Sequence, residues 1–203
     1  MRLILVRHGQ TDENTKGIIQ DPEVALDEKG RLQAGLVAKK LQSEKINLAY
    51  ISDFKRTTDT AAEILKFHPE TKEIFTPELR EKDAGVFVGR PQEDQKRARE
   101  TSGQTFYDFR PEGGESLVDL QKRIVAFYEK INRSHQNDTV LFVTHNGTIK
   151  TLMLHLTGKT FADWETINVA NTAVTVIEVN PEGQLEIKVS NDAEHLVEAD
   201  ILP

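Results

Sequence analysis

The fold of this chain is indicated by one stretch near its start, LILVRHGQT at residues 3–11. The apolar residues 3–6 are typical of a short buried strand. Arg7 and His8 follow directly, which places a cation and an imidazole at the carboxyl end of the strand, where α/β sheets present ligand-binding residues. Gly9 permits a sharp turn and a close approach of a ligand to the backbone. The planar guanidinium of Arg7 suits phosphate, and His8 is a candidate nucleophile or acid–base group.

A second stretch repeats this pattern late in the chain, as TVLFVTHNG at residues 139–147. It is again an apolar strand that ends in a histidine, His145, with a glycine two residues further on. Apolar residues then follow at helical spacing over residues 149–156. Two strand ends that each carry a histidine and then a glycine predict one shared pocket at the edge of a single sheet.

The remaining apolar patterns alternate between strand and helix. Strand-like runs occupy residues 3–6, 48–51, 139–143, 174–179 and, more weakly, 185–189. Between them, Asp27 is a good N-cap for a helix that holds Leu32, Leu36, Val37 and Leu41, and a second helix is predicted over residues 56–66. Ser116 begins a capping box before a third helix, with apolar residues every three or four positions.

This alternation predicts an α/β fold, a three-layer α/β/α sandwich around a mostly parallel central sheet. The last two strand runs are separated by Asn180-Pro181-Glu182-Gly183, which predicts a hairpin and therefore one antiparallel edge strand. The polar segment at about 89–115 interrupts the alternation. It is interpreted as a lid-like insertion or, equally, as a plain solvated excursion. No linker-like stretch divides the 203 residues, which predicts a single domain over 1–203.

Composition excludes several classes of function. The net charge of -7 disfavours a general nucleic-acid binder, although a few arginines that converge in a cleft still create a local positive field. The absence of cysteine excludes disulfides, thiolate metal sites and a cysteine nucleophile. No apolar run approaches the length of a membrane span, and no leader pattern is present at the start. We therefore expect a cytoplasmic protein with no nucleic-acid or membrane partner; the oligomeric state is not predicted.

Six sequence blocks in order resemble the signatures of the histidine phosphatase superfamily, the phosphoglycerate-mutase-like proteins. The blocks are LVRHGQT at 5–11 with Asn14, ALDEKG at 25–30, YISDFKRT at 50–57, ELRE at 78–81 with GVFVG at 85–89, PEGGES at 111–116 and the strand that ends at His145. They span nearly the whole chain. The remaining histidines, which match no signature, are interpreted as surface or structural residues: His68, His135, His155 and His195.

The resemblance implies a role for each catalytic candidate. His8 would attack phosphorus and form a phosphohistidine, while Arg7 and Arg56 would bind the phosphoryl oxygens. His145 would stabilise charge in the transition state, and Glu81 would protonate the leaving oxygen and then activate water. Further substrate contacts are assigned to Asn14, Gln20 and Asn146. No metal or cofactor is implied, because arginines and histidines supply the positive field.

The chain departs from the family pattern at Ile18, a position that is often arginine, which predicts a weaker contact to a multiply charged substrate. The segment between Glu81 and His145 is short compared with the insertions of the mutases, which shield their site from water. The sequence therefore predicts a metal-independent phosphomonoester phosphatase for a small-molecule phosphate ester, for example a sugar phosphate, phosphoglycerate or nucleoside-like phosphate. Mutase-type phosphoryl transfer and a non-catalytic phosphate-binding module are the alternatives.

Overall fold

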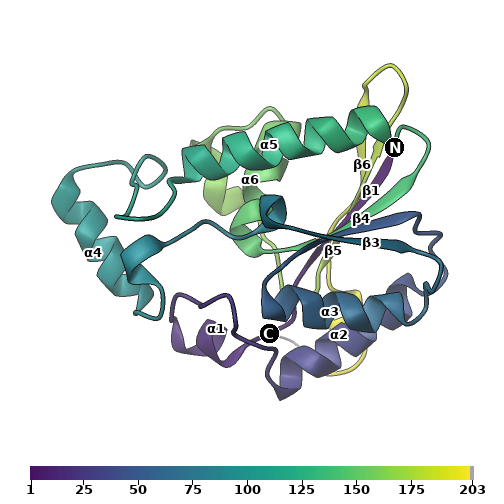
Figure 1. Cartoon of the computed structure of the whole chain (residues 1–203), viewed down its shortest axis with the longest axis horizontal. Coiled ribbons are helices and arrows are strands. Elements are labelled where there is room, and N and C mark those ends of the chain that lie inside the picture. Colours follow the sequence, from purple (N-terminus) through teal and green to yellow (C-terminus); the bar gives the residue numbers. More distant parts are fainter. Residues whose placement is uncertain (202–203) are drawn as a thin grey trace.

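A computed structural model describes residues 1–201 of the chain. Within that range a six-stranded sheet has the strand order β3-β2-β4-β1-β5-β6 (Figure 1). The strands are β1 (Arg2–Arg7), β2 (Leu48–Ser52), β3 (Lys72–Thr76), β4 (Thr139–Thr144), β5 (Val174–Val179) and β6 (Leu185–Asp192). The first four are mutually parallel, and β5 runs antiparallel between β1 and β6. The mostly parallel sheet with an antiparallel pair at one edge is therefore confirmed.

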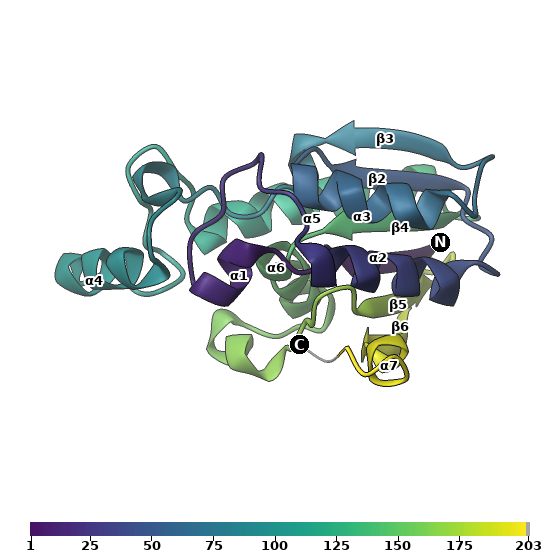
Figure 2. The same cartoon turned by 90° about the horizontal axis from the view of Figure 1, so that it is seen from below.

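Helices cover both faces of this sheet, which confirms the three-layer arrangement (Figures 1 and 2). One face carries α2 (Glu28–Leu41) and α3 (Lys55–Leu65); the other carries α5 (Leu117–Ser134) and α6 (Asn146–Leu156). The shorter elements are α1 (Asp12–Lys16), α4 (Gln92–Ser102), α7 (Glu194–Val197) and the 3₁₀ turns η1 (Pro77–Leu79), η2 (Gly85–Phe87) and η3 (Phe161–Thr166).

The apolar run in β1 is continuous because both faces of the strand are buried. Leu3 and Leu5 pack into the core beneath α5 and α6, whereas Ile4 and Val6 pack into the core beneath α2 and α3. All four side chains are 0–1% exposed. This is the pattern expected of a strand inside a parallel sheet with helices on both sides.

The predicted helix starts are also present. The carboxylate of Asp27 accepts a hydrogen bond from the backbone N–H of Gly30, and Ser116 forms a reciprocal capping box with Asp119. These bonds satisfy N–H groups that have no partner inside the helix. Within α2, however, Leu32 is 54% exposed and Gln33 is fully buried, because the buried stripe runs through small residues and Gln33 instead of Leu32.

One strand, β3, has no counterpart in the sequence-based prediction. Its residues are exposed except for Thr76 and the half-buried Ile74, since it lies at the open edge of the sheet. Charged residues at Lys72 and Glu73 replace the apolar run that marks the inner strands, and Phe75 is 55% exposed. An edge strand with one solvated side therefore lacks the signal that identified the others.

The segment 89–115 extends away from the sheet and contains α4, none of whose residues is buried (Figures 1 and 2). Its start is fastened to the loop after α1, because Gly89 donates from its backbone N–H to the carbonyl of Ile19 at 2.8 Å. Its end is fastened by Arg123 of α5, which binds the carboxylate of Glu115 at 2.8 Å. We call this segment the excursion.

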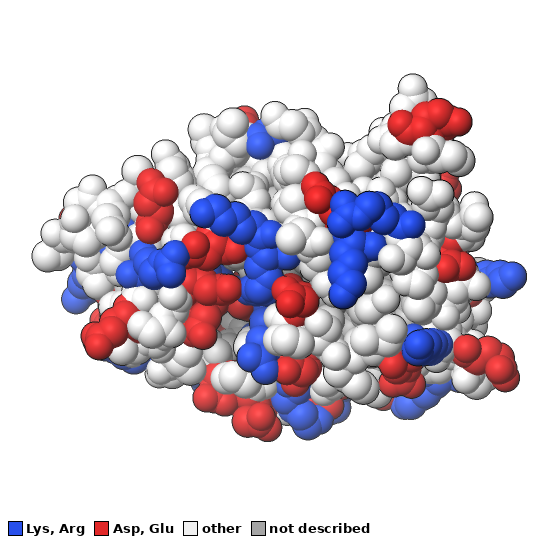
Figure 3. Space-filling view, turned by 45° about the horizontal axis from the view of Figure 1, so that its top comes forward, with Lys and Arg blue, Asp and Glu red and all other residues white. Residues whose placement is uncertain are grey.

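Acidic and basic side chains are interspersed over the face shown in Figure 3, without separation into one basic and one acidic area. Several ion pairs of the described residues join side chains three or four positions apart, as in Arg90–Asp94 at 2.8 Å. No helix in the described part of the chain is both long and apolar enough to cross a bilayer.

Candidate active site

The carboxyl ends of β1, β2 and β4 meet at one edge of the sheet, because these strands are parallel neighbours. A cavity of about 880 Å³ lies there, between the strand ends and the excursion. Every site residue proposed from the sequence lines it: Arg7, His8, Asn14, Gln20, Arg56, Glu81, His145 and Asn146. The fold thus brings together side chains from six separate segments of the chain.

His8 is held in one orientation at the end of β1. Its side chain is 3% exposed, and its Nδ1 lies 2.7 Å from the carbonyl oxygen of Gly9. A carbonyl oxygen only accepts hydrogen bonds, so Nδ1 carries the ring proton and Nε2 keeps its lone pair. Burial, together with the charges of Arg56 and Arg7, holds the pKa of His8 well below its usual range. At neutral pH the ring is therefore an uncharged imidazole with Nε2 free.

The turn after His8 is packed directly against the start of α2. A Cβ atom on Gly9 would lie 2.5 Å from the carbonyl oxygen of Gly30, and one on Gly30 would lie 2.0 Å from that of Gln10. Neither distance can accommodate a side chain, because both neighbours are backbone atoms. The buried Gln33 also accepts a hydrogen bond from the backbone N–H of Gln10 at 2.8 Å. Helix α2 therefore fixes the shape of the turn.

Two arginines, the half-buried Arg7 and the buried Arg56, place their charges near the imidazole of His8. Arg7 donates from Nη1 to the carbonyl of Val169 at 2.7 Å, and Arg56 donates from Nη1 to that of Asp21 at 3.1 Å. Neither Nε atom has a partner within residues 1–201. Burial lowers the pKa of each guanidinium to about 10, against the opposing effect of the Glu81 carboxylate. Both groups remain charged at pH 7 and keep donors for an anion.

His145, at the end of β4, is completely buried beside His8. The two ring centroids are 5.2 Å apart at an interplanar angle of 63°. Nε2 of His145 lies 2.8 Å from the hydroxyl of Ser52, and Nδ1 has no partner among the described residues. Burial and the neighbouring charge of Arg56 hold its pKa well below the usual range. The ring is therefore neutral at pH 7 and has one unused nitrogen.

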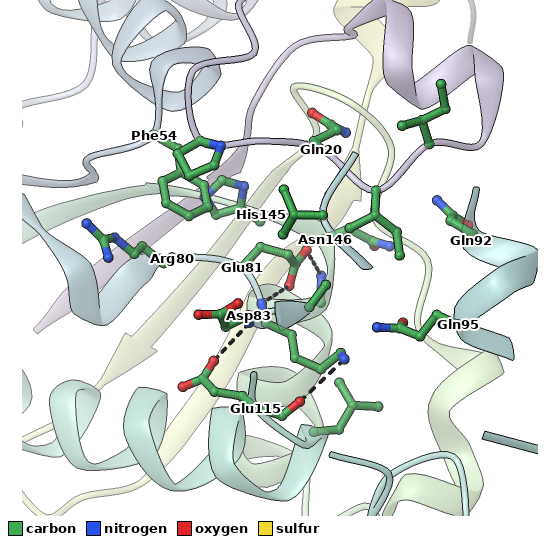
Figure 4. Close-up of a pocket in the computed structure, with 18 of the residues that line it drawn as sticks. Gln20, Phe54, Arg80, Glu81, Asp83, Gln92, Gln95, Glu115, His145 and Asn146 are labelled. Carbon is green, nitrogen blue, oxygen red and sulfur yellow. Dashed lines mark hydrogen bonds between the residues drawn. The ribbon is translucent and has the colours of Figure 1, made fainter. Parts of the chain in front are cut away.

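Glu81 is the carboxylate of the site, in the loop after η1. It accepts hydrogen bonds from the backbone N–H of Gly147 at 2.8 Å and from that of Lys82 at 3.0 Å (Figure 4). The loop itself is tied to α6, because the hydroxyl of Thr148 donates to the carbonyl of Arg80 at 2.9 Å. A Cβ on Gly147 would lie 2.4 Å from the Glu81 carboxylate, so a side chain here would displace the carboxylate from its present position.

The three candidate substrate-binding residues differ in how much of their side chain is free. Asn14 uses its amide oxygen to accept from the backbone N–H of Thr11 at 3.2 Å, within the cap of α1. The amide oxygen of Gln20 is buried and has no partner among the described residues. Asn146 is the first residue of α6 and lines the cavity. Asn14 thus also stabilises the local fold, whereas Gln20 has an unused acceptor.

Residues outside the predicted set complete the cavity wall. Phe54 lies between two guanidinium groups, with Arg56 5.0 Å and Arg80 5.3 Å from the ring centroid. Arg80 is in turn paired with Asp53, with its Nε 2.7 Å from the carboxylate. Gln92 and Gln95 of α4 face the cavity from the other side (Figure 4). The sequence carried only a weak signal for Gln92 and Gln95, because nothing in it shows which turns of α4 face the site.

Groups that hold the catalytic candidates in place also went unpredicted. Ser52 contacts His145, Thr60 accepts from the backbone N–H of Gly9 at 3.1 Å, and Val169 binds Arg7 through its carbonyl. Ser52 lies inside a recognised sequence block at the end of a strand, which is a usable signal. A backbone carbonyl such as that of Val169 has no sequence signal.

No group of three or more histidine, aspartate or glutamate side chains within residues 1–201 is arranged to hold a metal ion.

The family model for the histidine phosphatase superfamily (branch 1) matches residues 3–193. The chain belongs to this superfamily. The resemblance seen in the six sequence blocks is thereby confirmed.

The relatives include both phosphatases and mutases. A metal-independent phosphoserine phosphatase of Arabidopsis thaliana is 32% identical over 96% of this chain and 82% of its own length. A 2,3-bisphosphoglycerate-dependent phosphoglycerate mutase of Bartonella bacilliformis is 34% identical over 77% of this chain and 81% of its own length. The solved structure of Bacillus stearothermophilus YhfR superposes with a TM-score of 0.86 at 27% identity, covering 96% of this chain and 98% of that one. The protein is accordingly a histidine-phosphatase-type phosphoric monoester hydrolase.

Proposed function

We propose that the protein hydrolyses a small phosphate monoester through a phosphohistidine at Nε2 of His8, without a metal ion. The proposal is carried by one observation: a neutral imidazole, with Nδ1 bound to a carbonyl and Nε2 free, lines the same cavity as the guanidinium groups of Arg7 and Arg56. Such a site attracts a phosphate dianion and points a nucleophile at its phosphorus. The metal-independent phosphatase among the relatives supports the same chemistry.

In the first step the Nε2 lone pair of His8 attacks phosphorus and the ester P–O bond breaks. Glu81 takes up a proton from solvent as the phosphate ester binds and gives this proton to the leaving oxygen, so the alcohol departs neutral. Arg7 and Arg56 bind the non-bridging oxygens through their free N–H groups. His145 donates to the same oxygens from Nδ1 while Ser52 donates to its Nε2, which leaves no buried nitrogen of that ring unpaired.

In the second step a water molecule attacks the phosphohistidine. Glu81, now a carboxylate, removes a proton from the water as the P–N bond breaks, and inorganic phosphate forms. His8 returns to the neutral imidazole with its proton still on Nδ1. The hydrogen bonds to Glu81 from the Gly147 and Lys82 backbones keep this carboxylate at the edge of the cavity throughout.

We favour hydrolysis over phosphoryl transfer because the cavity leaves room for a water molecule beside the substrate and α4 does not pack over it as a buried cover. The excursion contributes no buried residue from α4, and the cavity beneath it holds about 880 Å³. A mutase is also among the relatives, so the second candidate function is transfer of a phosphoryl group between two positions of one substrate. For the substrate, the phosphatase relative points to phosphoserine, and related hydroxy-acid and sugar phosphates belong in the same panel.

The decisive experiment measures phosphate release from such a panel, with 3-phosphoglycerate and 4-nitrophenyl phosphate included, in the presence of EDTA. Release that survives chelation supports the metal-independent phosphatase. A product that keeps its phosphate at a new position, formed only with a bisphosphate primer, would instead establish the mutase. If the protein binds phosphate specifically but catalyses neither reaction, it is a non-catalytic phosphate-binding module.

Glu81→Gln separates the two steps. Alkyl esters need a proton on the leaving oxygen, so their turnover is expected to fall by about 10²–10⁴. The first step with 4-nitrophenyl phosphate needs no such proton, so phosphohistidine is expected to accumulate and to appear in an alkaline quench as an added phosphoryl mass. Equal effects on both esters without accumulation would show that another group is the acid.

A further inference from the structure

A single loop between η3 and β5, residues 169–172, contacts both Arg7 and His8. The carbonyl of Val169 accepts from the guanidinium of Arg7 at 2.7 Å. The side-chain amide of Asn171 donates to the carbonyl of His8 at 3.0 Å. The backbone N–H of Thr172 lies 3.1 Å from the carbonyl of Arg7 and 3.4 Å from that of His8. The position of this loop therefore sets the position of the arginine and of the nucleophile's backbone.

The loop is held in a conformation that its own sequence disfavours. Thr172 has a φ of 53°, in the left-handed region that β-branched residues rarely adopt. Asn191 of β6 has a φ of 50°, and the only other non-glycine residue of this kind within residues 1–201 is Asp200. Strained backbone persists where neighbouring groups over-determine it, and it concentrates at functional sites. Something must therefore fix Thr172 from outside the loop.

The contacts that fix it come from the C-terminal part of the chain. Asn191 accepts from the backbone N–H of Ala170 at 2.8 Å through its side-chain oxygen. His195 of α7 places Nε2 3.1 Å from the hydroxyl of Thr172. Burial lowers the pKa of His195 to about 4, so its contact with Thr172 is a hydrogen bond between neutral groups at pH 7.

Helix α7 is itself anchored on the body of the protein. His195 is 7% exposed and Leu196 is fully buried. The carboxylate of Asp192 pairs with Lys40 of α2 at 2.7 Å. Helix α7 thus holds the imidazole of His195 against Thr172, and both residues are buried.

We propose that Asn191 and His195 form a C-terminal brace that positions Arg7 and His8 for catalysis through the loop 169–172. His195 lies just beyond residue 193, where the match to the family model ends. It acts through Thr172 and not on the substrate, so it is a positioning residue. This inference rests on the proposed function, in which His8 attacks phosphorus and Arg7 binds the phosphoryl oxygens.

The test compares two substitutions of His195 in the full chain. His195→Phe keeps a planar ring of similar size but removes the hydrogen bond, and kcat for 4-nitrophenyl phosphate is expected to fall about 10- to 100-fold, because small misplacements of reacting groups have effects of this size. The inhibition constant of inorganic phosphate should rise with it, since Arg7 moves too. His195→Gln, whose amide can reach the same hydroxyl, should restore kcat to within about threefold of the parent.

The partner residue gives a second test. Thr172→Val keeps the β-branched shape and removes only the hydroxyl, whereas Thr172→Ser keeps the hydroxyl. The valine variant should resemble His195→Phe, and the double variant should be no slower than either single one, because both remove the same bond. Multiplying effects would show that the two residues act separately and would overturn the proposal.

A control distinguishes positioning from stability. Leu196→Ala opens a cavity in the same helix without touching the hydrogen bond, so the melting temperature should fall while kcat of the folded enzyme stays within about twofold. If His195→Phe lowers the melting temperature and leaves kcat unchanged, the brace is only a structural anchor. His8→Ala is measured alongside: if that variant still forms product, the proposed function has failed, whatever the result at His195.

Discussion

The two sides of the cavity are built in opposite ways. The inner side consists of strand ends and carries His8, Arg56 and His145, whose side chains are 0–3% exposed. The outer side is the excursion, whose helix α4 has no buried residue. Phosphate chemistry requires groups held within a fraction of an ångström, which a packed sheet supplies. Selection of the leaving group requires only a wall of suitable shape and polarity, which an exposed segment can supply and change.

The largest expected effect is the removal of the nucleophile from the inner side. His8→Ala should lower kcat by at least about 10⁴-fold, as loss of a catalytic nucleophile does in other enzymes. The alanine leaves the turn at Gly9 in place, so circular dichroism should show an unchanged fold. Rapid quenching should detect no phosphorylated protein. A variant that keeps more than a few per cent of its activity would mean that the inner side does not contain the nucleophile.

Two arginines of the same cavity provide a matched comparison between a buried and an exposed guanidinium. Arg56→Ala removes a buried guanidinium whose Nε has no partner among the described residues and should lower kcat/KM by about 10²–10³. Arg80→Ala removes a guanidinium that is 46% exposed and already paired with Asp53, and should lower kcat/KM by less than about tenfold. The same steady-state assay measures both. Similar losses at the two positions would contradict the idea that the buried groups carry the phosphate chemistry.

Acid should destabilise the inner side through its two buried histidines. The pKa values of His8 and His145 are lowered in the folded protein by burial and by the nearby arginines, so below about pH 6.5 only the unfolded chain takes up these protons. The free energy of unfolding should therefore fall as pH falls from 7 to 5, by up to about 1.4 kcal/mol per pH unit for each imidazole.

Urea unfolding at several pH values measures this slope. His145→Gln should reduce the slope, since it removes one buried imidazole. His155→Gln changes an exposed imidazole and should leave the slope as it is. A stability that does not change between pH 7 and pH 5 would show that the buried rings are not held neutral.

The smallest effects are expected on the excursion. Gln95→Ala removes a side-chain amide whose nitrogen is buried and has no partner within the described residues. It should change kcat/KM for an ester with a large leaving group by about three- to tenfold, and leave the inhibition constant of phosphate unchanged. Gln104→Ala, an exposed position of the same segment, is the matched control. An altered phosphate constant would mean that the excursion also contributes to the inner site.

The same contrast explains what the sequence could predict. The strands that end in His8 and His145 are buried on both faces, so they produce unbroken apolar runs that are readily recognised. Strand β3 was missed because an exposed edge tolerates Lys72 and Glu73. The apolar Leu32, one of the residues that indicated helix α2, is exposed, whereas the polar Gln33 beside it is buried. The apolar pattern that predicts a strand or helix was clear where burial dictates the residue type, and it was absent where burial does not.

The site follows a similar rule. Arg7, His8 and His145 were proposed because their chemistry stands out at a strand end, whereas Arg56 and Glu81 were proposed only through the ordered blocks that resemble the family. Residues that position them were not, since Val169 acts through its carbonyl and Thr60 through a hydroxyl four residues after Arg56. Such supporting contacts depend on how distant segments are folded together, and only the three-dimensional arrangement reveals them.

The contact between Gly9 and Gly30 also has a consequence for protein engineering. Each glycine lies where the other segment's backbone leaves no space for a methyl group, whereas Gly35 and Gly103 have open space around the same position. In a randomised library, only glycine should be recovered at positions 9 and 30. A substitution at one of them cannot be compensated by a change at the other, because each Cβ would meet backbone atoms. A new substrate range is therefore best sought by recoding the excursion while these two codons are kept constant.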